Sequence, residues 1–466
     1  MITCRARCSR HQSLLRYNTG KQYKRLLLGL VLGAAIFAAA RPNAQTFQTL
    51  YSFNGPPDGS IPTGVAIDRL GNLYGATRAG GHIARCRTNS AANLSDGIPL
   101  PGCGIVYQLG PAGIWAETVL HSFTSGADGA YPGNSLVLNK GALYGTTEYG
   151  GFANNTTCRD GCGTVFRFNL IPQRLRTLYT FTGGADSGGS YTAVVFDTNG
   201  NLYGTVEGGD GASPVDDLVF ELMPPAPGST AWTFNGLDPP GGGGDGEIRS
   251  SLVVDQAGNL YGTTRPGFPC DPDCGTFFGT VFVLPPPDYT EITLYTFTGG
   301  ADGASPSGLT IHYQAGGNPV LFGTTRGGGA DNAGTVFEFD PATQMLTTLY
   351  AFTGGADGAN PSSPLIFRGG ALYGEALNGG DPTMCPGNAN FPPGCGTVFK
   401  FNLATQRLRT LYIFSGGADG AGPIGSMALD TSGALYGTTA AGGASTNCIW
   451  PAVFPSGCGT VYRITP

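Results

Sequence analysis

An aspartate recurs along this chain five residues after a phenylalanine, and carboxylates at regular intervals are candidate ligands for a cation such as calcium. The stretch LYTFTGGADG (294–303) shows the motif. Its aspartates are Asp58, Asp128, Asp186, Asp302, Asp357 and Asp419, with Asp245 displaced by an insertion in the fourth copy. Asp-Gly is also typical of tight turns, because glycine adopts positive φ and the aspartate side chain bonds its own backbone. The nonapeptide period of calcium-binding repeats is absent, and we therefore favour the turn interpretation.

A second candidate site is a position that varies while its surroundings repeat. Each copy has a LYG-type motif whose aromatic residue we interpret as packing between repeats; these residues are Tyr74, Tyr144, Tyr203, Tyr261, Phe322, Tyr373 and Tyr436. Four residues further on stand Arg78, Glu148, Glu207, Arg265, Arg326, Leu377 and Ala440. A regular scaffold with a variable rim is where binding specificity is placed. We therefore predict ligand contacts from Arg78, Glu148, Glu207, Arg265 and Arg326.

Two alternatives accompany this prediction. Arg78 with Glu148, and Glu207 with Arg265, are neighbours that would form ion pairs between repeats, and such surface pairs contribute about 0–1 kcal/mol each. The third repeat also concentrates acidic residues in one loop, namely Glu207, Asp210, Asp216 and Asp217. This cluster is either a cation site or a solvated loop.

The residues typical of catalysis are few. Beyond residue 44 the chain has three histidines, His82, His121 and His312, in three different repeats. His121 replaces the tyrosine of a LYTF motif, which favours a structural role. No Ser-His-Asp order, HExxH motif or phosphate-binding loop is present. Two carboxylates facing each other across a channel would suit glycoside cleavage, but no pair of residues is marked for this role.

Ten cysteines beyond residue 44 fall into five local couples, each just before a GTVF-type strand. The couples are Cys86/Cys103, Cys158/Cys162, Cys270/Cys274, Cys385/Cys395 and Cys448/Cys458. Zinc binding is disfavoured, because no second cysteine pair stands beside any of the couples. We predict five disulfides, formed in an oxidising compartment.

Residues 1–44 predict export. A basic lead without acidic residues precedes the apolar run LLLGLVLGAAIFAAA (26–40), whose 15 residues are short for a membrane span and suited to a signal-peptide core. Cleavage is expected after Ala40 or Ala44, which leaves a secreted or periplasmic protein, residues 45–466, with no membrane span. An uncleaved anchor is the alternative.

The charge of the remaining chain excludes a class of partners. Residues 1–44 contain eight of the 25 Lys and Arg and none of the 31 Asp and Glu, which leaves a net charge near −14. Nucleic acids and anionic membranes require a basic surface. We therefore expect neither as a partner.

Seven copies of one unit position these residues. The copies of its aromatic motif are LYSF (50–53), LHSF (120–123), LYTF (178–181), AWTF (231–234), LYTF (294–297), LYAF (349–352) and LYIF (411–414). Between them recur runs such as SLVVD (251–255), NLYGTT (259–264) and GTVFVL (279–284). These β-branched and aromatic runs, bounded by Gly, Pro, Asp and Asn, predict four short antiparallel strands per copy.

The expected fold is all-β, a seven-bladed β-propeller with four antiparallel strands per blade. The first run, 47–53, matches the last element of a unit, while the final run, GTVYRI (459–464), matches the third. We therefore predict that the N-terminal strand joins the last blade, closing the ring into one domain without free edges. A β-sandwich or a β-solenoid is the alternative.

The motifs LYTFTGGADG (294–303), GNLYGTT (258–264) and GTVFEF (334–339) resemble those of choice-of-anchor tandem repeat GloVer-containing proteins, a family of exported bacterial proteins. The resemblance spans nearly all of residues 45–466. The family name implies members with different C-terminal surface anchors, whereas this sequence stops at Pro466, directly after its last predicted strand. The resemblance implies no catalytic residues.

We therefore expect a non-catalytic binding module that recognises an extracellular polysaccharide or protein on the face carrying the variable loops. A monomer without cofactor is expected, apart from calcium at an acidic site. The alternatives are a structural envelope or matrix protein and a carbohydrate-active hydrolase or lyase.

Overall fold

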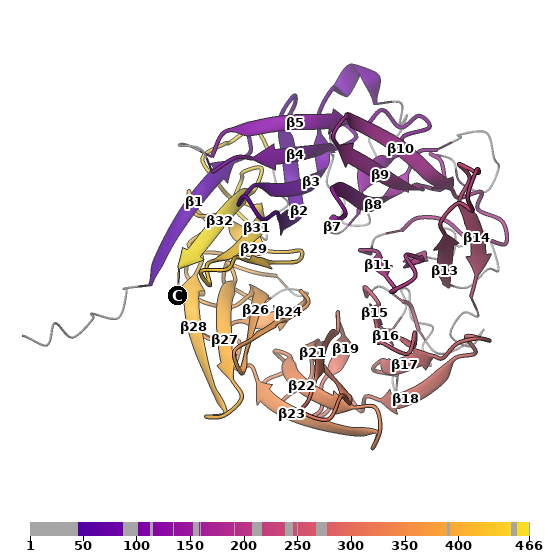
Figure 1. Ribbon diagram of the computed structural model, residues 1–466. Helices are drawn as coiled ribbons and strands as arrows, with labels where there is room; N and C mark the ends of the chain where they lie inside the picture. The colour runs from indigo at the N-terminus through magenta and orange to yellow at the C-terminus, as the bar shows by residue number, and fades with distance from the viewer. Residues whose placement is uncertain are drawn as a thin grey trace, which may run out of the picture. The chain divides into compact units, whose positions relative to one another are not determined.

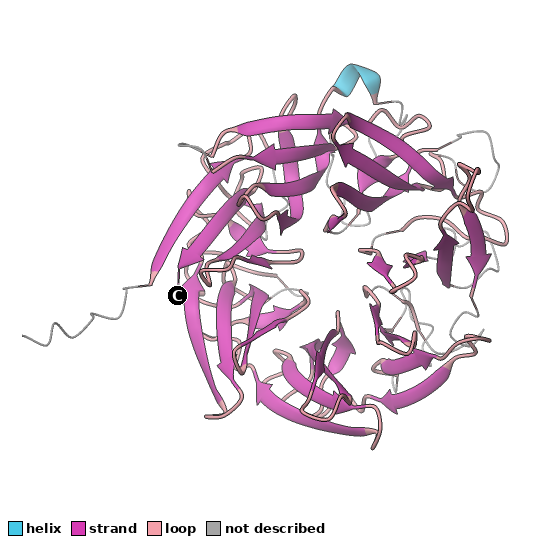
Figure 2. Ribbon diagram, viewed as in Figure 1, coloured by secondary structure: helices cyan, strands magenta, loops and turns pink. Residues whose placement is uncertain are grey.

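The computed structural model describes residues 45–86, 101–111, 115–133, 135–151, 158, 160–190, 192–206, 217–237, 246–248, 250–266, 277–388, 392–448 and 454–465. Within them, seven antiparallel sheets stand around a central axis (Figure 1). The fold is the predicted seven-bladed β-propeller. The described residues contain no α-helix, only a 3-10 turn at Ile83–Arg85 (Figure 2).

In the first three blades the strands run from the central axis outward in chain order. Blade 1 is β2 (Gly59–Ile67), β3 (Leu73–Gly80), β4 (Ile105–Leu109) and β5 (Glu117–Ser122). Blade 2 is β6 (Ala130–Pro132) with β7 (Val137–Asn139), β8 (Ala142–Tyr149), β9 (Thr164–Leu170) and β10 (Gln173–Thr180). Blade 3 is β11 (Val195–Phe196), β12 (Leu202–Val206), β13 (Leu218–Met223) and β14 (Thr233–Gly236).

The other four blades follow the same plan. Blade 4 is β15 (Val253–Val254), β16 (Leu260–Thr264), β17 (Thr280–Leu284) and β18 (Ile292–Thr296). Blade 5 is β19 (Ala304–Pro306) with β20 (Thr310–Tyr313), β21 (Pro319–Gly327), β22 (Thr335–Asp340) and β23 (Met345–Ala351). Blade 6 is β24 (Ala359–Pro361) with β25 (Ile366–Arg368), β26 (Ala371–Asn378), β27 (Thr397–Asn402) and β28 (Arg407–Ile413). Blade 7 is β29 (Ala421–Pro423) with β30 (Ala428–Leu429), β31 (Leu435–Ala441), β32 (Thr460–Thr465) and β1 (Thr46–Ser52).

The sequence of each strand follows from its place in the blade. The second strands, such as β12 and β16, are buried throughout, because neighbouring blades cover both of their faces. The outer strand β10 has no fully buried residue, and Gln173, Arg174 and Arg176 are exposed. The glycine of each LYG motif makes room for the neighbouring strands: a Cβ at Gly145 would lie 2.7 Å from Leu136 and 2.8 Å from Phe166. The core therefore sits in the seams between blades.

The first and last strands close the ring, as predicted. Strand β1 pairs antiparallel with β32, from Thr46 opposite Thr465 to Ser52 opposite Thr460. The strand nearest the N-terminus thus supplies the outer edge of blade 7 (Figure 1). The ring is held by backbone hydrogen bonds at this junction.

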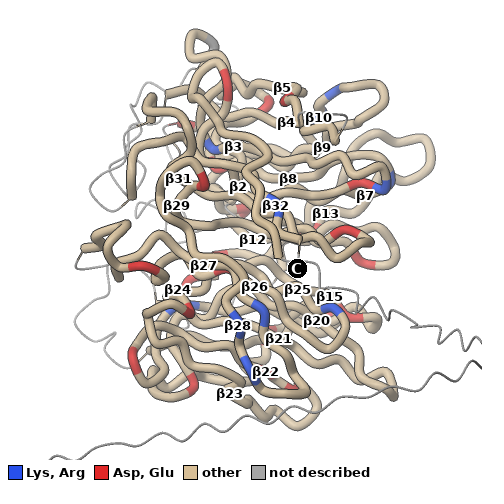
Figure 3. The backbone as a smooth tube through the Cα atoms, turned by 90° about the vertical axis from the view of Figure 1, so that its left-hand side faces the viewer, with Lys and Arg blue, Asp and Glu red and all other residues tan. Residues whose placement is uncertain are grey.

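The ring has two unlike faces. The loop between the second and third strands starts beside the GGADG turn of the same repeat: Gly151 N–H donates to the Gly126 carbonyl, and Gly380 N–H donates to the Gly355 carbonyl. We call this side, with the long loops and GGADG turns, the loop face. The opposite side, with the short turns that join first to second and third to fourth strands, is the turn face, toward which β7, β15 and β20 lie (Figure 3).

Blade 3 departs from the expected register. The sequence predicts that AWTF (231–234) takes the place of LYTF. In the structure, Phe234 pairs with Leu222, and the equivalent pair in blade 7 is Phe47 with Ile464. In the first repeat that position lies six residues before the LYTF phenylalanine, Phe53. The equation of AWTF with LYTF is therefore wrong. Packing explains the difference, since Phe234 stacks on Tyr179 of blade 2 (4.5 Å between ring centres) as Phe47 stacks on Tyr412 (3.7 Å).

Candidate functional site

Four disulfides lock loops on the loop face, and four of the five predicted pairings are confirmed. They are Cys86–Cys103, Cys158–Cys162, Cys385–Cys395 and Cys448–Cys458. Each lies in the loop between the second and third strand of its blade. The fifth predicted couple, Cys270 and Cys274, lies outside the described residues.

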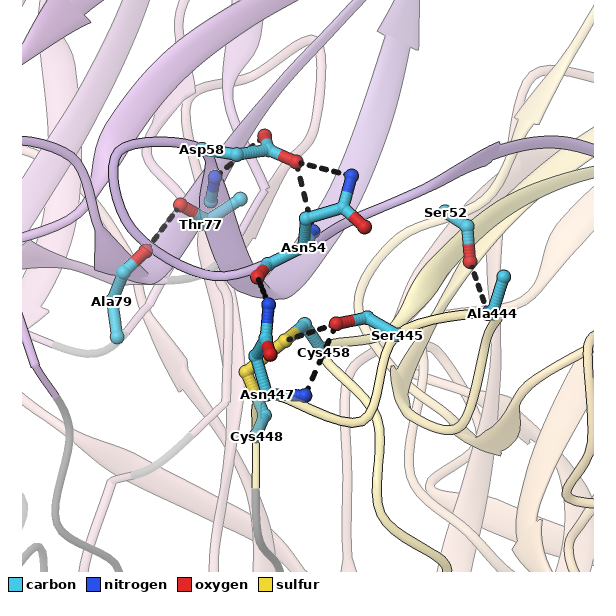
Figure 4. Close-up of a disulfide and its surroundings, with 11 residues drawn as sticks. Ser52, Asn54, Asp58, Thr77, Ala79, Ala444, Ser445, Asn447, Cys448 and Cys458 are labelled. Carbon is cyan, nitrogen blue, oxygen red and sulfur yellow. Dashed lines mark hydrogen bonds between the residues drawn. A yellow bond between two sulfur atoms is a disulfide. The ribbon is translucent and has the colours of Figure 1, made fainter.

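The loop of blade 7 shows how such a loop is held (Figure 4). Beside the Cys448–Cys458 bond, Asn447 Nδ2 donates to the Asn54 carbonyl (2.9 Å). The Ala444 N–H donates to Ser52 Oγ (2.7 Å) at the end of β1. The loop is thus fixed to the strand that closes the ring.

The carboxylate oxygens of the GGADG aspartates accept hydrogen bonds from within their own turns. Asp302 accepts bonds from Thr298 N–H (2.7 Å), Thr298 Oγ1 (2.5 Å) and Tyr295 OH (3.1 Å). Burial opposes ionisation of this carboxyl, but the hydrogen bonds outweigh it and hold the pKa of Asp302 below its usual range. The same backbone bond, from the residue four positions earlier, is made to Asp58, Asp128, Asp186, Asp357 and Asp419.

These contacts are the turn chemistry that the sequence favoured. Asp245, the displaced member, lies outside the described residues. His121 takes the place of the tyrosine and contacts Asp128 through Nε2 (3.0 Å). Within the part of the chain that the structure describes, no group of three or more His, Cys, Asp or Glu side chains is arranged to hold a metal.

The described rim residues Arg78, Glu148 and Arg265 form two separate ion pairs. Arg78 and Glu148 form an ion pair of 2.5 Å between blades 1 and 2, and the Glu148 side chain is only 2% exposed. Arg265 pairs with Glu247 of its own blade (3.7 Å). The expected partner of Arg265, Glu207, lies outside the described residues. Arg326 is partly exposed on the strand that leads to the loop of blade 5.

The predicted acidic cluster is described at one residue only. The Asp217 carboxylate accepts the Ile248 N–H (2.5 Å), a contact that joins blades 3 and 4. The other members, Glu207, Asp210 and Asp216, lie outside the described residues. At the rim position of the last two blades, Leu377 and Ala440 are buried.

One buried acid was missed by the sequence analysis. Glu375 lies in the seam between blades 6 and 7, where it accepts a bond from Ser363 Oγ (2.9 Å) and one from Tyr462 OH. Burial raises the pKa of Glu375 to about 7, although both hydrogen bonds act in the opposite direction. The signal was present, because LYGEA replaces LYGTT in this repeat.

A second acid lies in the seam that closes the ring. Tyr51 OH donates to Asp58 Oδ2 (3.1 Å) and lies 3.4 Å from Glu117 Oε2. Burial, and then the neighbouring Asp58 carboxylate, raise the pKa of Glu117 to about 8. Glu117 belongs to the outer strand β5, and Glu375 belongs to β26. Each acid lies in a seam between two blades.

The model of the Gloeobacter/Verrucomicrobia repeat matches residues 11–278 and 275–466. No curated protein matches the chain. Similar solved structures include a luciferin-regenerating enzyme, with 12% identity over 72% of this chain and 91% of that one (TM-score 0.43). A chain of a nidogen/laminin complex has 15% identity over 66% and 90% (TM-score 0.37). A gluconolactonase from Xanthomonas campestris has 14% identity over 65% and 78% (TM-score 0.35).

Proposed function

Because the chain belongs to the Gloeobacter/Verrucomicrobia repeat family, we propose that it is an exported, non-catalytic recognition module. It binds an extracellular polysaccharide or protein on the loop face. The family and the propeller are compatible with such a role, since a closed ring presents one rigid face to a partner.

The observation that carries this proposal is the difference between the two faces. All four described disulfides lie in loops of the loop face. The turns opposite are short hairpins such as 68–72, where Asp68 accepts the Leu70 and Asn72 N–H groups. Long loops tied down by covalent bonds lose less conformational entropy on binding than free ones, which favours recognition.

Disulfides form and persist in oxidising compartments, and the four described here are consistent with one. On the proposed route, residues 1–44 direct export and are removed after Ala40 or Ala44. In the described residues, no helix has the length and apolarity needed to cross a membrane.

Within the loop face, we assign direct contacts to the partly exposed arginines Arg78, Arg265 and Arg326. Glu148 is buried and orients the Arg78 guanidinium through its ion pair. Glu207 remains part of the proposed contact set, and the cluster Glu207, Asp210, Asp216 and Asp217 remains the place where calcium would act. Guanidinium groups bind carboxylate and sulfate groups through two parallel hydrogen bonds.

The test uses the full chain, exported into an oxidising compartment and purified, with its N-terminus read by mass spectrometry. Binding to a panel of bacterial and plant polysaccharides is measured with calcium and with a chelator, and released sugar is the readout for cleavage. Binding without sugar release supports the proposal, and loss of binding in chelator assigns calcium a role.

The variants Arg78→Ala, Arg265→Ala and Arg326→Ala should each weaken binding, whereas Arg174→Ala on the outer strand β10 should not. If all three variants bind with unchanged affinity, the rim arginines are not the ligand contacts. If no polysaccharide binds, capture of a protein partner becomes the test of the loop face. Failure of both would favour a structural role, and sugar release would favour a hydrolase or lyase.

A further inference from the structure

A pocket of about 490 Å³ opens between blades 2 and 3 on the turn face. Its apolar lining comes from Val137 and Leu138 on β7 and from Val195 and Phe196 on β11. Lys140, in the turn that follows β7, lies at its margin. Volumes of about 300–1,000 Å³ are typical of sites for small molecules.

Other seams are closed on this face by specific contacts. Between blades 6 and 7, Arg368 donates to the carbonyls of Asp430 (2.5 Å) and Thr431 (2.9 Å). Between blades 5 and 6, the rings of His312 and Phe367 stack at 3.8 Å. In blade 2 the residue equivalent to Arg368 is Asn139. The pocket opens beside Asn139 and Lys140.

The backbone at Lys140 is strained. Its φ is +47°, in the left-handed region, and Gly141 follows at +76°. The same two-residue turn in blade 6 is made of Gly369 (+58°) and Gly370 (+72°). Glycine adopts this conformation without penalty, whereas a lysine does so at a cost. Other non-glycine residues, such as Gln344 and Gln406, share this conformation, and Lys140 is the one of them that lines the pocket.

The blade 2 side of this seam is positively charged. No ion pair joins Lys140 to any residue that the structure describes. Tyr144 contacts Phe196 edge to face (4.8 Å), and the Arg167 guanidinium lies 5.6 Å from the Tyr144 ring centre. In blades 1, 3, 4 and 7 the equivalent tyrosine bonds an aspartate of the adjoining turn. Blade 2 has Asn139-Lys140 there and no such aspartate.

The Asp197 carboxylate, on the opposite wall, forms no ion pair with Lys140 in the described structure. Asp197 also lines the pocket, but it accepts bonds from Asn201 N–H (2.8 Å), Asn201 Nδ2 (3.0 Å) and Tyr203 OH (3.4 Å). Its oxygens are thereby held within the turn of blade 3. Lys140 remains as the cation available to a ligand.

We propose that this pocket binds a small ring-shaped carboxylate, with the apolar face of the ring on Leu138 and Phe196 and the carboxylate on Lys140 Nζ. A uronic acid and an aromatic acid share this chemistry. The site lies on the face opposite the loops and is independent of the loop-face proposal, so either can fail alone.

The experiment titrates the full chain, with its disulfides formed, with D-glucuronate and with benzoate, followed by calorimetry or ligand-observed NMR. D-glucose, benzamide and inorganic phosphate are the matched controls. We expect a Kd of about 0.1–1 mM for at least one carboxylate, and binding weaker by about tenfold or more for its neutral counterpart. Preference for glucuronate or for benzoate identifies the source.

The variant Lys140→Gly separates binding from stability. It removes the cation and relieves the strained φ, so affinity should fall by about tenfold or more while the melting temperature stays within about 4 °C of the wild type. Arg407→Ala, which removes an exposed cation on the outer strand of blade 6, should change neither. The proposal is overturned if Lys140→Gly binds the carboxylate as tightly as the wild type, or if the neutral counterparts bind equally well. It is also overturned if only phosphate binds, or if no carboxylate binds at a ligand concentration of roughly ten times the expected Kd.

Discussion

The seam between blades 6 and 7 and the seam that closes the ring, between blades 7 and 1, each contain an acid, but they accommodate it differently. Glu375 is fully buried, and both of its oxygens accept hydrogen bonds. Glu117 is partly exposed, one of its oxygens is buried without a partner, and it lies beside Asp58.

Other seams place an apolar residue where blade 1 has Glu117. Leu175, Leu346 and Leu408 pair with the equivalent residues of the third strand and pack against the preceding blade. A seam thus accommodates a buried acid when each oxygen has a donor. At the closing seam, the neighbouring carboxylate adds to the cost of ionising the acid.

The largest effect is expected from Glu375→Ala. It leaves Tyr462 OH and Ser363 Oγ without their buried acceptor and opens a cavity, so the free energy of unfolding should fall by about 2–4 kcal/mol. Urea unfolding near pH 6 measures it, with Ser363→Ala as the milder control. A loss below about 1 kcal/mol would show that the seam adapts around the missing carboxyl.

The next largest effect is the dependence of the free energy of unfolding on pH. Because the folded pKa of Glu375 (about 7) and that of Glu117 (about 8) lie above the ordinary glutamate pKa of 4.5, the folded state binds their protons more tightly. Their contribution to stability is complete below that value and is lost as the pH rises through the folded pKa. We expect unfolding free energy to fall between about pH 5 and pH 8, by up to about 3 kcal/mol for Glu375. Glu375→Gln should remove the larger part of the slope; an unchanged slope would contradict its assignment.

A smaller effect, of opposite sign, is expected at the closing seam. Glu117→Leu restores the apolar residue of the other seams and should raise stability at pH 8–9 by about 1 kcal/mol, allowing for solvent screening of a partly exposed group. At pH 5 the gain should be smaller. The converse change, Leu408→Glu between blades 5 and 6, is the matched control and should destabilise most at high pH. Equal effects at both pH values would mean that proton binding is not involved.

The smallest effect is expected at the turn-face end of the seam between blades 6 and 7. Arg368→Ala removes two bonds to carbonyls of blade 7 and should cost about 0.5–1 kcal/mol. It should also open a space like the pocket between blades 2 and 3. A crystal structure of the variant checks this, and a collapsed seam would show that the pocket has another cause.

Much of the fold follows from the repeat. Seven copies of one four-strand unit, with 47–53 matching the element missing at the end, were enough to predict the blades and the closure. The cysteine couples were found because each recurs at one place in the unit. Phe234 was misplaced because AWTF has the letters of LYTF, while the contact with Tyr179 sets the actual register.

The candidate site was harder to predict, because residues at the same position of different repeats have different surroundings in the structure. Glu148 is buried and paired with Arg78 of the preceding blade, which is the ion pair that the sequence offered as the alternative to a ligand contact. The pocket beside Lys140 became visible only once the turns of neighbouring blades were compared in space. Glu375 and Glu117, by contrast, were detectable as departures from the consensus of the repeat.

The closure of the ring sets an order of events during synthesis. Strand β1 is the first strand of the propeller to be made, and its partner β32 is the last. Until then β1 has no neighbour along its inner edge, and unpaired edges are where chains associate wrongly. The pairing also joins residues at opposite ends of the chain, which is slow because a long loop must close. Until blade 7 is complete, a nascent molecule is therefore open to capture by another copy or by a chaperone.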